Sequence, residues 1–362
     1  MLFRSSQWWS QITSARRMLD AAIDELDREK NVILTITSST PWPDDYRQTL
    51  NDRLEMDFAS RSVTEIDDYD SNVGRYMLEN HCRKEKRFEY RPPKSVGTFL
   101  GESKGLTLDD KILWVKVRSK SDLAEWITFI TDYRNAAGKG SKTALFILET
   151  DESFSPGFDG RYFARHEIGM DVPEYMKYTF ASILADEERV RARFVPYLAQ
   201  LVTSCCDDVE LIPRCIKVHR EFMANPYEVM QKIVADYSKS DGTGFVMDEP
   251  KDTFLKRVWE AQLKTLFPYI ESYRGYIINQ LIGQILSKIQ FPYRTSTATV
   301  ETPYDLELGH ILSAIGAKKL EMGDSAEYER LKLFWNARNK LAHLNPIGFS
   351  DASGIIESSF GR

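Results

Sequence analysis

The chain has 362 residues, 42 % of them hydrophobic and 12 % aromatic, which excludes a globally disordered protein and predicts two domains or slightly more. A formal net charge of −6 excludes a surface coated with basic residues for duplex DNA. The four cysteines form no C-x-x-C pair, so we expect no metal site and no disulfide framework, and a cytoplasmic location.

The first 150 residues predict strands that alternate with helices. Apolar residues at helical spacing predict an amphipathic helix over residues 5–29, and an apolar, β-branched run predicts a buried strand at 31–37. The alternation continues with helices at about 44–54, 74–82 and 122–134, and with strands at 63–66, 112–117 and 142–149. Such an order predicts an α/β domain with a mostly parallel sheet.

This order of elements resembles the core of AAA+ or STAND-type P-loop NTPases. In those proteins the first strand leads into a phosphate-binding loop, which needs glycines for close backbone approach and a lysine for charge. The matching segment here, 38–43, reads Ser-Ser-Thr-Pro-Trp-Pro and has neither. The glycine-containing segment 138–143 precedes a strand and is interpreted as a loop. We therefore expect residues 1–150 to be a degenerate, P-loop-less NTPase-like domain that binds no cofactor and acts as a sensor or docking platform.

The rest of the chain predicts helices. We expect a helical middle region over residues 151–240, a linker over 241–252 rich in Ser, Gly, Asp and Pro, an all-α helical bundle over 253–348, and a C-terminal tail over 349–362. No window reaches the ~18 continuous apolar residues of a membrane span, so we expect no membrane association.

Within the bundle, proline and capping residues predict where helices begin, bend and end. Pro268 is expected to kink or split a long first helix. Thr302-Pro303 is expected to begin a helix that runs to about residue 315. The segment 324–327, Asp-Ser-Ala-Glu, predicts a capping box for the last helix, which Asn345-Pro346 should stop.

The last helix brings together an arginine, an asparagine and a histidine. On a helical projection Asn339 and His343 lie one turn apart on a polar strip with Asn336, and Arg338 falls within the apolar stripe. The residues expected in that stripe are Leu331, Phe334, Trp335, Leu341 and Ala342. A cation at such a place is costly to bury without a partner, which indicates a functional site or an interface.

The segment Arg338-Asn339-x-x-x-His343 resembles the signature of the HEPN family, and the resemblance covers roughly residues 253–345. Active HEPN proteins are dimeric, metal-independent RNases. The resemblance implies that His343 is a general base or acid, that Arg338 holds the scissile phosphate, and that Asn339 orients the imidazole or the phosphate. It also implies an endoribonuclease that forms a homodimer through its C-terminal bundle, an effector of prokaryotic antiphage defence or a toxin, restrained or triggered by a partner ATPase or sensor protein.

An alternative interpretation is a non-catalytic assembly or regulatory subunit. In that case Arg338 would pair with an acid of a neighbouring helix, such as Glu307, and His343 would cap the helix end, where the helix dipole favours it. His310 is expected to pack or to cap. Elsewhere, the segment 83–94 interleaves basic residues with two aromatic ones, which is typical of an RNA contact or of a solvated loop.

Overall fold

A computed structural model describes residues 5–69, 72–103, 108, 110–137, 142–151, 158, 160–169, 172–294, 299–358 and 360. The chain divides into two compact units, Met1–Asp171 and Val172–Arg362. Each unit has its own core. Among the described residues, no helix combines the length and the apolar composition that a membrane span requires.

The first unit is built on a five-stranded parallel sheet. Its strand order is β2-β3-β4-β1-β5, and every neighbouring pair is parallel. The strands are β1 (Asn31–Ile36), β2 (Ser62–Ile66), β3 (Lys111–Lys116), β4 (Leu145–Thr150) and β5 (Phe163–Ile168). The three inner strands are apolar runs because both faces of a parallel sheet are covered. The predicted α/β fold with a mostly parallel sheet is therefore confirmed.

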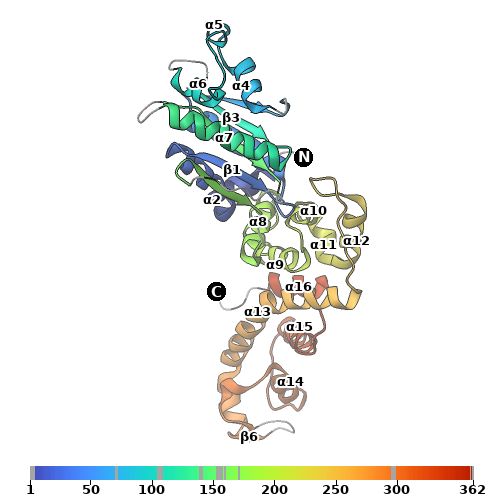
Figure 1. Cartoon of the computed structure of the whole chain (residues 1–362). Helices are drawn as coiled ribbons and strands as arrows, with labels where there is room; N and C mark the ends of the chain where they lie inside the picture. Colours follow the sequence, from blue (N-terminus) through green and yellow to red (C-terminus); the bar gives the residue numbers. More distant parts are fainter. Residues whose placement is uncertain are drawn as a thin grey trace. The chain divides into compact units, whose positions relative to one another are not determined.

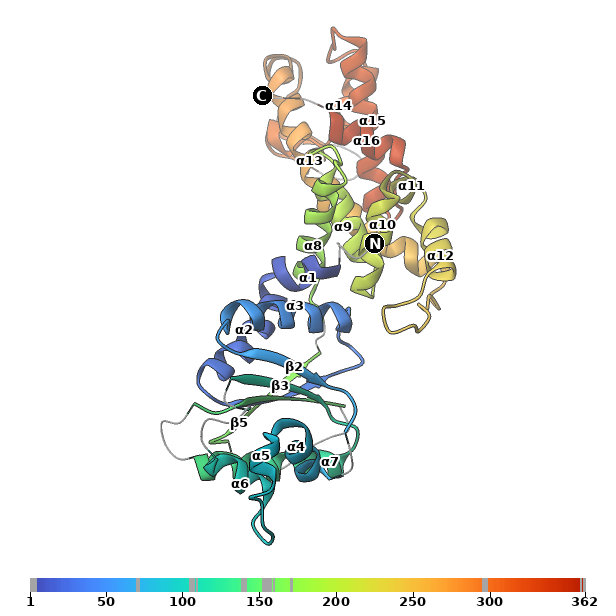
Figure 2. The ribbon, with the colours of Figure 1, turned by 90° about the horizontal axis from the view of Figure 1, so that it is seen from above.

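Helices cover both faces of this sheet, as Figure 2 shows. One face carries α1 (Ser5–Gln11), α2 (Thr13–Asp27) and α3 (Pro43–Asp57). The other carries α4 (Val73–His81), α5 (Lys84–Arg87), α6 (Val96–Glu102) and α7 (Lys120–Ala137). The single helix predicted over residues 5–29 is thus two helices, which are separated at Ile12.

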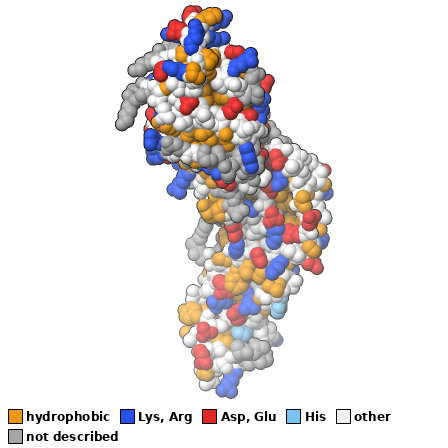
Figure 3. Space-filling view, in the orientation of Figure 1, with side chains coloured by type: hydrophobic (Ala, Val, Ile, Leu, Met, Phe, Trp, Pro, Cys, Tyr) orange, Lys and Arg blue, Asp and Glu red, His pale blue; other side chains and the backbone are white. Residues whose placement is uncertain are grey.

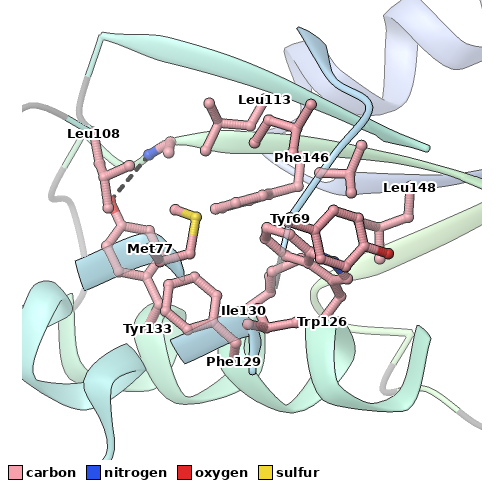
Figure 4. Close-up of a cluster of buried hydrophobic side chains, with 14 of the residues drawn as sticks. Tyr69, Met77, Leu108, Leu113, Trp126, Phe129, Ile130, Tyr133, Phe146 and Leu148 are labelled. Carbon is pink, nitrogen blue, oxygen red and sulfur yellow. Dashed lines mark hydrogen bonds between the residues drawn. The ribbon is translucent and has the colours of Figure 1, made fainter. Parts of the chain in front are cut away.

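The second face is closed by a large aromatic core. Figure 4 shows Trp126, Phe129 and Tyr133 of α7 packed with Phe146 of the sheet and Met77 of α4. The rings of Phe129 and Phe146 meet edge to face, with their centroids 6.3 Å apart. The Tyr133 hydroxyl accepts a hydrogen bond of 3.1 Å from the Ala144 backbone N–H, so this buried phenol is satisfied.

Residues expected in the helical middle region instead complete the sheet. β5 pairs with β1 along its whole length, so the α/β unit extends past residue 150 to Asp171, and the helices of 151–240 begin only at Glu174. As an edge strand, β5 is buried mainly at Phe163 and Ile168 and carries polar residues between them. The strand therefore lacks the apolar run by which the inner strands are recognised.

The second unit is helical. Its first part contains α8 (Glu174–Glu187), α9 (Val195–Cys205), α10 (Ile212–Lys217), α11 (His219–Ala224) and α12 (Pro226–Asp236). A single compact unit joins these helices to the bundle, and the predicted linker at 241–252 does not separate two units. The bundle contains α13 (Lys251–Lys288), α14 (Leu308–Gly316), α15 (Ser325–Ala342) and α16 (Phe349–Glu357), labelled in Figure 1.

Three details of the bundle differ from expectation. α13 runs through Pro268 as one helix of 38 residues. Pro303 begins only a short 3-10 turn, and α14 starts at Leu308. The expected tail contains α16, whose buried residues Ala352, Ile355 and Ile356 add to the core. All three depend on tertiary packing, which overrides local helix-breaking and helix-ending signals.

The pH dependence of stability follows from a buried histidine at the end of α4. Burial and the nearby charge of Lys111 lower the pKa of His81 to about 4, below the ordinary value of about 6.5. The unfolded chain therefore binds this proton first as the pH falls. We expect His81 to remove roughly 3 kcal/mol of unfolding free energy between about pH 6.5 and pH 4. Urea unfolding at several pH values should show a shallower decline in His81→Gln than in the wild type; equal declines would contradict this assignment.

Candidate functional site at the end of the last bundle helix

The N-terminus of α15 is held by side chains from two helices. The Asp324 carboxylate accepts a 2.9 Å hydrogen bond from the Ala326 backbone N–H, as an N-cap residue does. Glu327 was expected to complete a capping box. Its carboxylate instead accepts from the Tyr273 hydroxyl of α13 at 2.7 Å and pairs with Arg330 at 2.6 Å. This cross-helix bond fixes the start of α15 against α13.

The buried face of α15 differs slightly from the predicted stripe. Leu331, Phe334 and Leu341 are buried as expected, but Trp335 is half-buried and Ala342 is exposed. Ala337 takes the remaining buried place, since spacings of three and four residues lead from Phe334 through it to Leu341. The ring of Phe334 stacks on Tyr273, with centroids 4.2 Å apart. Arg338 lies between Leu331 and Phe334 on the helical projection, so it falls within the apolar stripe as expected, and it is half-buried there.

The C-terminus of α15 closes in a Schellman motif at His343, the C-cap residue. The Asn345 N–H donates to the Lys340 carbonyl at 3.0 Å, and the Leu344 N–H donates to the Leu341 carbonyl at 3.4 Å. Leu344 adopts a left-handed φ of 60°, which usually requires glycine, and its side chain is 61 % exposed. The motif satisfies carbonyls of the last turn and sets where His343 leaves the helix.

Two side chains of α13 hold this turn in place. The Trp259 indole N–H donates to the Leu341 carbonyl at 2.7 Å. The buried carboxamide of Gln262 accepts from the Ile347 N–H at 2.7 Å and donates to the Ile347 carbonyl at 2.9 Å. Sequence analysis missed both residues. The only signal for Gln262 is a polar residue at a helical position between apolar ones.

Arg338 faces α14. Its Nη2 lies 3.3 Å from the Glu307 carboxylate, and the two side chains are 35 % and 47 % exposed. The Arg338 Nε is buried and has no hydrogen-bond partner among the described residues. An exposed pair of this kind contributes only about 0–1 kcal/mol to stability. The Arg338 side chain is thus partly exposed beside Glu307, while its Nε is enclosed by the protein.

Glu307, the partner of Arg338, also begins α14. Glu307 is its N-cap residue, and its backbone N–H donates to His310 Nδ1 at 3.1 Å, so His310 has the capping role expected for it. Trp335 lies close to Gly309, where an added Cβ would be 3.0 Å from the indole nitrogen. The lack of a side chain at Gly309 thus lets α14 approach α15 beside Arg338.

One chain brings only part of the predicted trio together. Helical geometry separates the directions of Asn339 and His343 by about 40°, but those of Arg338 and His343 by about 140°. Accordingly, Asn339 and the exposed His343 share one side of α15, and the two residues are joined by a 3.2 Å backbone hydrogen bond from the His343 N–H to the Asn339 carbonyl. Arg338 is directed to α14 instead. Among the described residues, no group of three or more His, Cys, Asp and Glu could hold a metal ion.

The loop after β1 is occupied by aromatic rings. The Trp9 indole N–H donates to the Pro41 and Trp42 carbonyls at 3.1 and 3.3 Å, and its ring packs on Tyr46 at 4.9 Å. A phosphate-binding loop presents backbone N–H groups to its ligand, whereas here carbonyl groups are engaged and large rings fill the space. Residues 138–141 of the second glycine-containing segment lie outside the described residues.

Comparison with known proteins gives structural similarity only at a low level. No protein-family model matches the sequence. No curated protein matches it either. Solved structures with similarity include the RuvB Holliday junction branch migration motor of Thermotoga maritima, at 12 % identity and a TM-score of 0.34, covering 89 % of this chain and 94 % of that one.

Two further structures lie at the same level. The replication initiator DnaA bound to AMPPCP and single-stranded DNA has 13 % identity and a TM-score of 0.32, covering 91 % of this chain and 94 % of that one. The HORMA:CdnC:Trip13 complex of E. coli MS115-1 has 11 % identity and a TM-score of 0.32, covering 67 % of this chain and 88 % of that one. The five-stranded parallel sheet with helices on both of its faces is an α/β fold.

The left-handed leucine at the helix end gives a direct stability test. Leu344→Gly should raise the unfolding free energy by about 1 kcal/mol, because glycine adopts positive φ without a Cβ clash and little buried surface is lost. Leu344→Ala, which keeps the strain, should show no such gain in urea unfolding. A destabilised glycine variant would mean that the leucine side chain is covered in solution.

Proposed function

We propose that the chain is a HEPN-type, metal-independent endoribonuclease whose site is built around Arg338, Asn339 and His343. The single observation that carries this proposal is the combination at the end of α15: an exposed imidazole at a helix end that α13 holds in place, on the same helix as a partly exposed arginine. The chemistry of RNA cleavage requires a proton-transfer group and a phosphate-binding cation, and these residues supply both.

The proposed reaction uses the 2′-hydroxyl of the RNA as nucleophile. Its oxygen forms a bond to the adjacent phosphorus while the bond from phosphorus to the 5′-oxygen breaks, which leaves a 2′,3′-cyclic phosphate and a 5′-hydroxyl. One imidazole accepts the 2′-proton and another group protonates the departing 5′-oxygen. The guanidinium of Arg338 binds the phosphate and stabilises its developing charge, and Asn339 orients the imidazole of His343 or the phosphate.

A second copy of the chain completes the site in this proposal. Within one chain Arg338 and His343 point in different directions, so the cation of one protomer would serve the imidazole of its partner. Ala342, His343 and Leu344 are all exposed at the helix end, which leaves this surface open for such a contact. The α/β unit, of degenerate NTPase type, would restrain or trigger the nuclease, alone or through a partner ATPase or sensor. A role as an antiphage effector or toxin belongs to the same proposal.

The alternative is a non-catalytic assembly or regulatory subunit. The observation that favours it is the contact between Arg338 and Glu307 within one chain, which gives the arginine a structural partner. In this case the bundle would be an interaction module, and His343 would serve only as the C-cap of α15.

Cleavage of total RNA and tRNA in EDTA tests the nuclease proposal. We expect the wild type to produce fragments with 2′,3′-cyclic phosphate ends. His343→Ala should lower the rate about 10²–10⁴-fold, as loss of a general base or acid does, and Arg338→Ala about 10²–10³-fold, as loss of a charge-stabilising donor does. Lys332→Ala and His219→Ala are the matched controls, since they remove a cation from α15 and a histidine elsewhere in the unit. Cleavage that survives in the Arg338 and His343 variants would refute the assignment.

A double-mutant cycle on the free energy of unfolding distinguishes the nuclease proposal from the structural alternative. Arg338→Gln, Glu307→Gln and the double variant should give a coupling energy of about 0.2–1 kcal/mol in urea unfolding, because both side chains are partly exposed. Glu307→Gln should retain cleavage, since it frees Arg338 to bind phosphate. A coupling energy above about 2 kcal/mol, together with no cleavage in any variant, would favour the structural role of the arginine.

A further inference from the structure

The segment 83–94 between α4 and α6 is a strongly basic projection of the first unit. Figures 1 and 2 show it leading away from the sheet, with α5 at its start. The segment contains six cationic side chains and two carboxylates, in a chain whose net charge is negative. They are Arg83, Lys84, Lys86, Arg87, Arg91 and Lys94, with Glu85 and Glu89. In Figure 3 Lys and Arg side chains are visible at the end of the first unit where Figure 1 labels α5, interspersed with acidic and hydrophobic side chains.

Most of these cations lack an acidic partner. Among the residues that the structure describes, only Lys86 and Lys94 of this segment form ion pairs, with Glu89 at 2.7 Å and with Glu102 at 2.5 Å. In the part of the chain that the structure describes, the four arginine and lysine side chains that remain have no carboxylate within ion-pair distance. Charges that are not neutralised locally attract a polyanion most strongly.

Arg87 and Arg91 hold the segment's backbone by hydrogen bonds, whereas the side chains of Arg83 and Lys84 do not. Arg87 Nε donates to the Cys82 carbonyl at 2.9 Å, and Arg91 Nη1 donates to the Tyr90 carbonyl at 2.8 Å. Arg83 and Lys84 are exposed, and in the described part of the chain their own side chains make no hydrogen bond, although the Cys82 thiol donates to the Arg83 carbonyl. They can therefore be changed without loss of a contact that holds the segment.

A solvent-exposed aromatic ring lies among these charged side chains. The Phe88 side chain is 79 % exposed. Its neighbour Tyr90, by contrast, packs edge to face on Phe99 of α6 at 5.5 Å and donates its hydroxyl proton to the Lys94 carbonyl at 2.9 Å. Tyr90 thus anchors the segment, and Phe88 presents a free face. Beside it the segment and α6 line an open hollow of about 380 Å³. Its charged lining consists of Lys86, Arg91 and Lys94 together with Glu89 and Glu102.

We propose that the segment 83–94, with Phe88 at its centre, binds single-stranded RNA. A base would stack on the exposed ring, and the flanking phosphates would be held by Arg83, Lys84 and Arg87, the combination that single-strand binders use. An acidic protein partner fits less well, because a protein interface needs an apolar centre and Phe88 is the one large apolar side chain of this segment that is so exposed. The inference deepens the proposed nuclease function and rests on it for the choice of RNA as the nucleic acid.

Binding is measured by the fluorescence anisotropy of a labelled oligouridylate, with the full-length protein carrying His343→Ala throughout to prevent cleavage. Arg83→Gln with Lys84→Gln should weaken binding at least tenfold at low salt. It should also reduce the slope of log affinity against log salt by about 1.4, at roughly 0.7 per lost phosphate contact. Phe88→Ala should weaken binding at least about fivefold without a change of slope, because stacking is not electrostatic.

Lys120→Gln with Lys232→Gln is the matched control, since it removes two exposed lysines that lie outside the segment. We expect this pair to bind as the parent does. No RNA binding by the parent, wild-type affinity in the two segment variants, or an equal loss in the control pair would each overturn the inference. If the segment variants lose binding while the wild type cleaves no RNA, the binding site stands and the nuclease proposal fails. If cleavage occurs and the binding pattern is absent, the reverse holds.

Discussion

The buried carboxamide of Gln262 sets the geometry of the candidate site. It satisfies both the N–H and the C=O of Ile347, the residue at which the chain turns back from α15 toward α16. A buried backbone segment without such a partner would lose the free energy of two hydrogen bonds, so the amide determines where this turn can lie. With the Trp259 indole on the Leu341 carbonyl, it fixes the helix end from which His343 leaves. The side chain of His343 is thus exposed to solvent, while hydrogen bonds from α13 hold the backbone on either side of it.

The same region contains a strained residue and a buried donor that has no partner among the described residues. Leu344 lies in the left-handed region, where a side chain costs about 1–2 kcal/mol, and Arg338 leaves a buried donor without a partner. Both features lie within six residues of each other, and both flank His343.

In the first unit, the loop after β1 and the polar groups near it are occupied by contacts within the unit. Its parallel sheet is complete and its core is densely aromatic, but the loop after β1 is filled by Trp9, Trp42 and Tyr46. At the carboxyl end of β4, Glu149 accepts from the Trp114 indole at 3.0 Å and pairs with Arg47 at 2.7 Å. The polar groups at this edge are therefore used within the unit. Gly97 and Gly101 let α6, which follows the basic segment 83–94, approach the backbone of α7 closely.

Local patterns in the sequence determined much of this architecture. The apolar runs of β1, β3 and β4 are recognisable because both faces of each strand are buried, and the Asp324 cap and the helical spacing of α15 are local in the same way. The edge strand β5, the continuity of α13 through Pro268 and the start of α14 at Leu308 were decided by tertiary contacts, which a local pattern does not contain. The trio at the end of α15 was singled out by its residue types on a predicted terminal helix, and its role stays a prediction. That Arg338 faces Glu307, that Gln262 and Trp259 hold the turn, and that Leu344 takes positive φ depend on α13 and α14, which are distant in the chain and meet α15 only after folding.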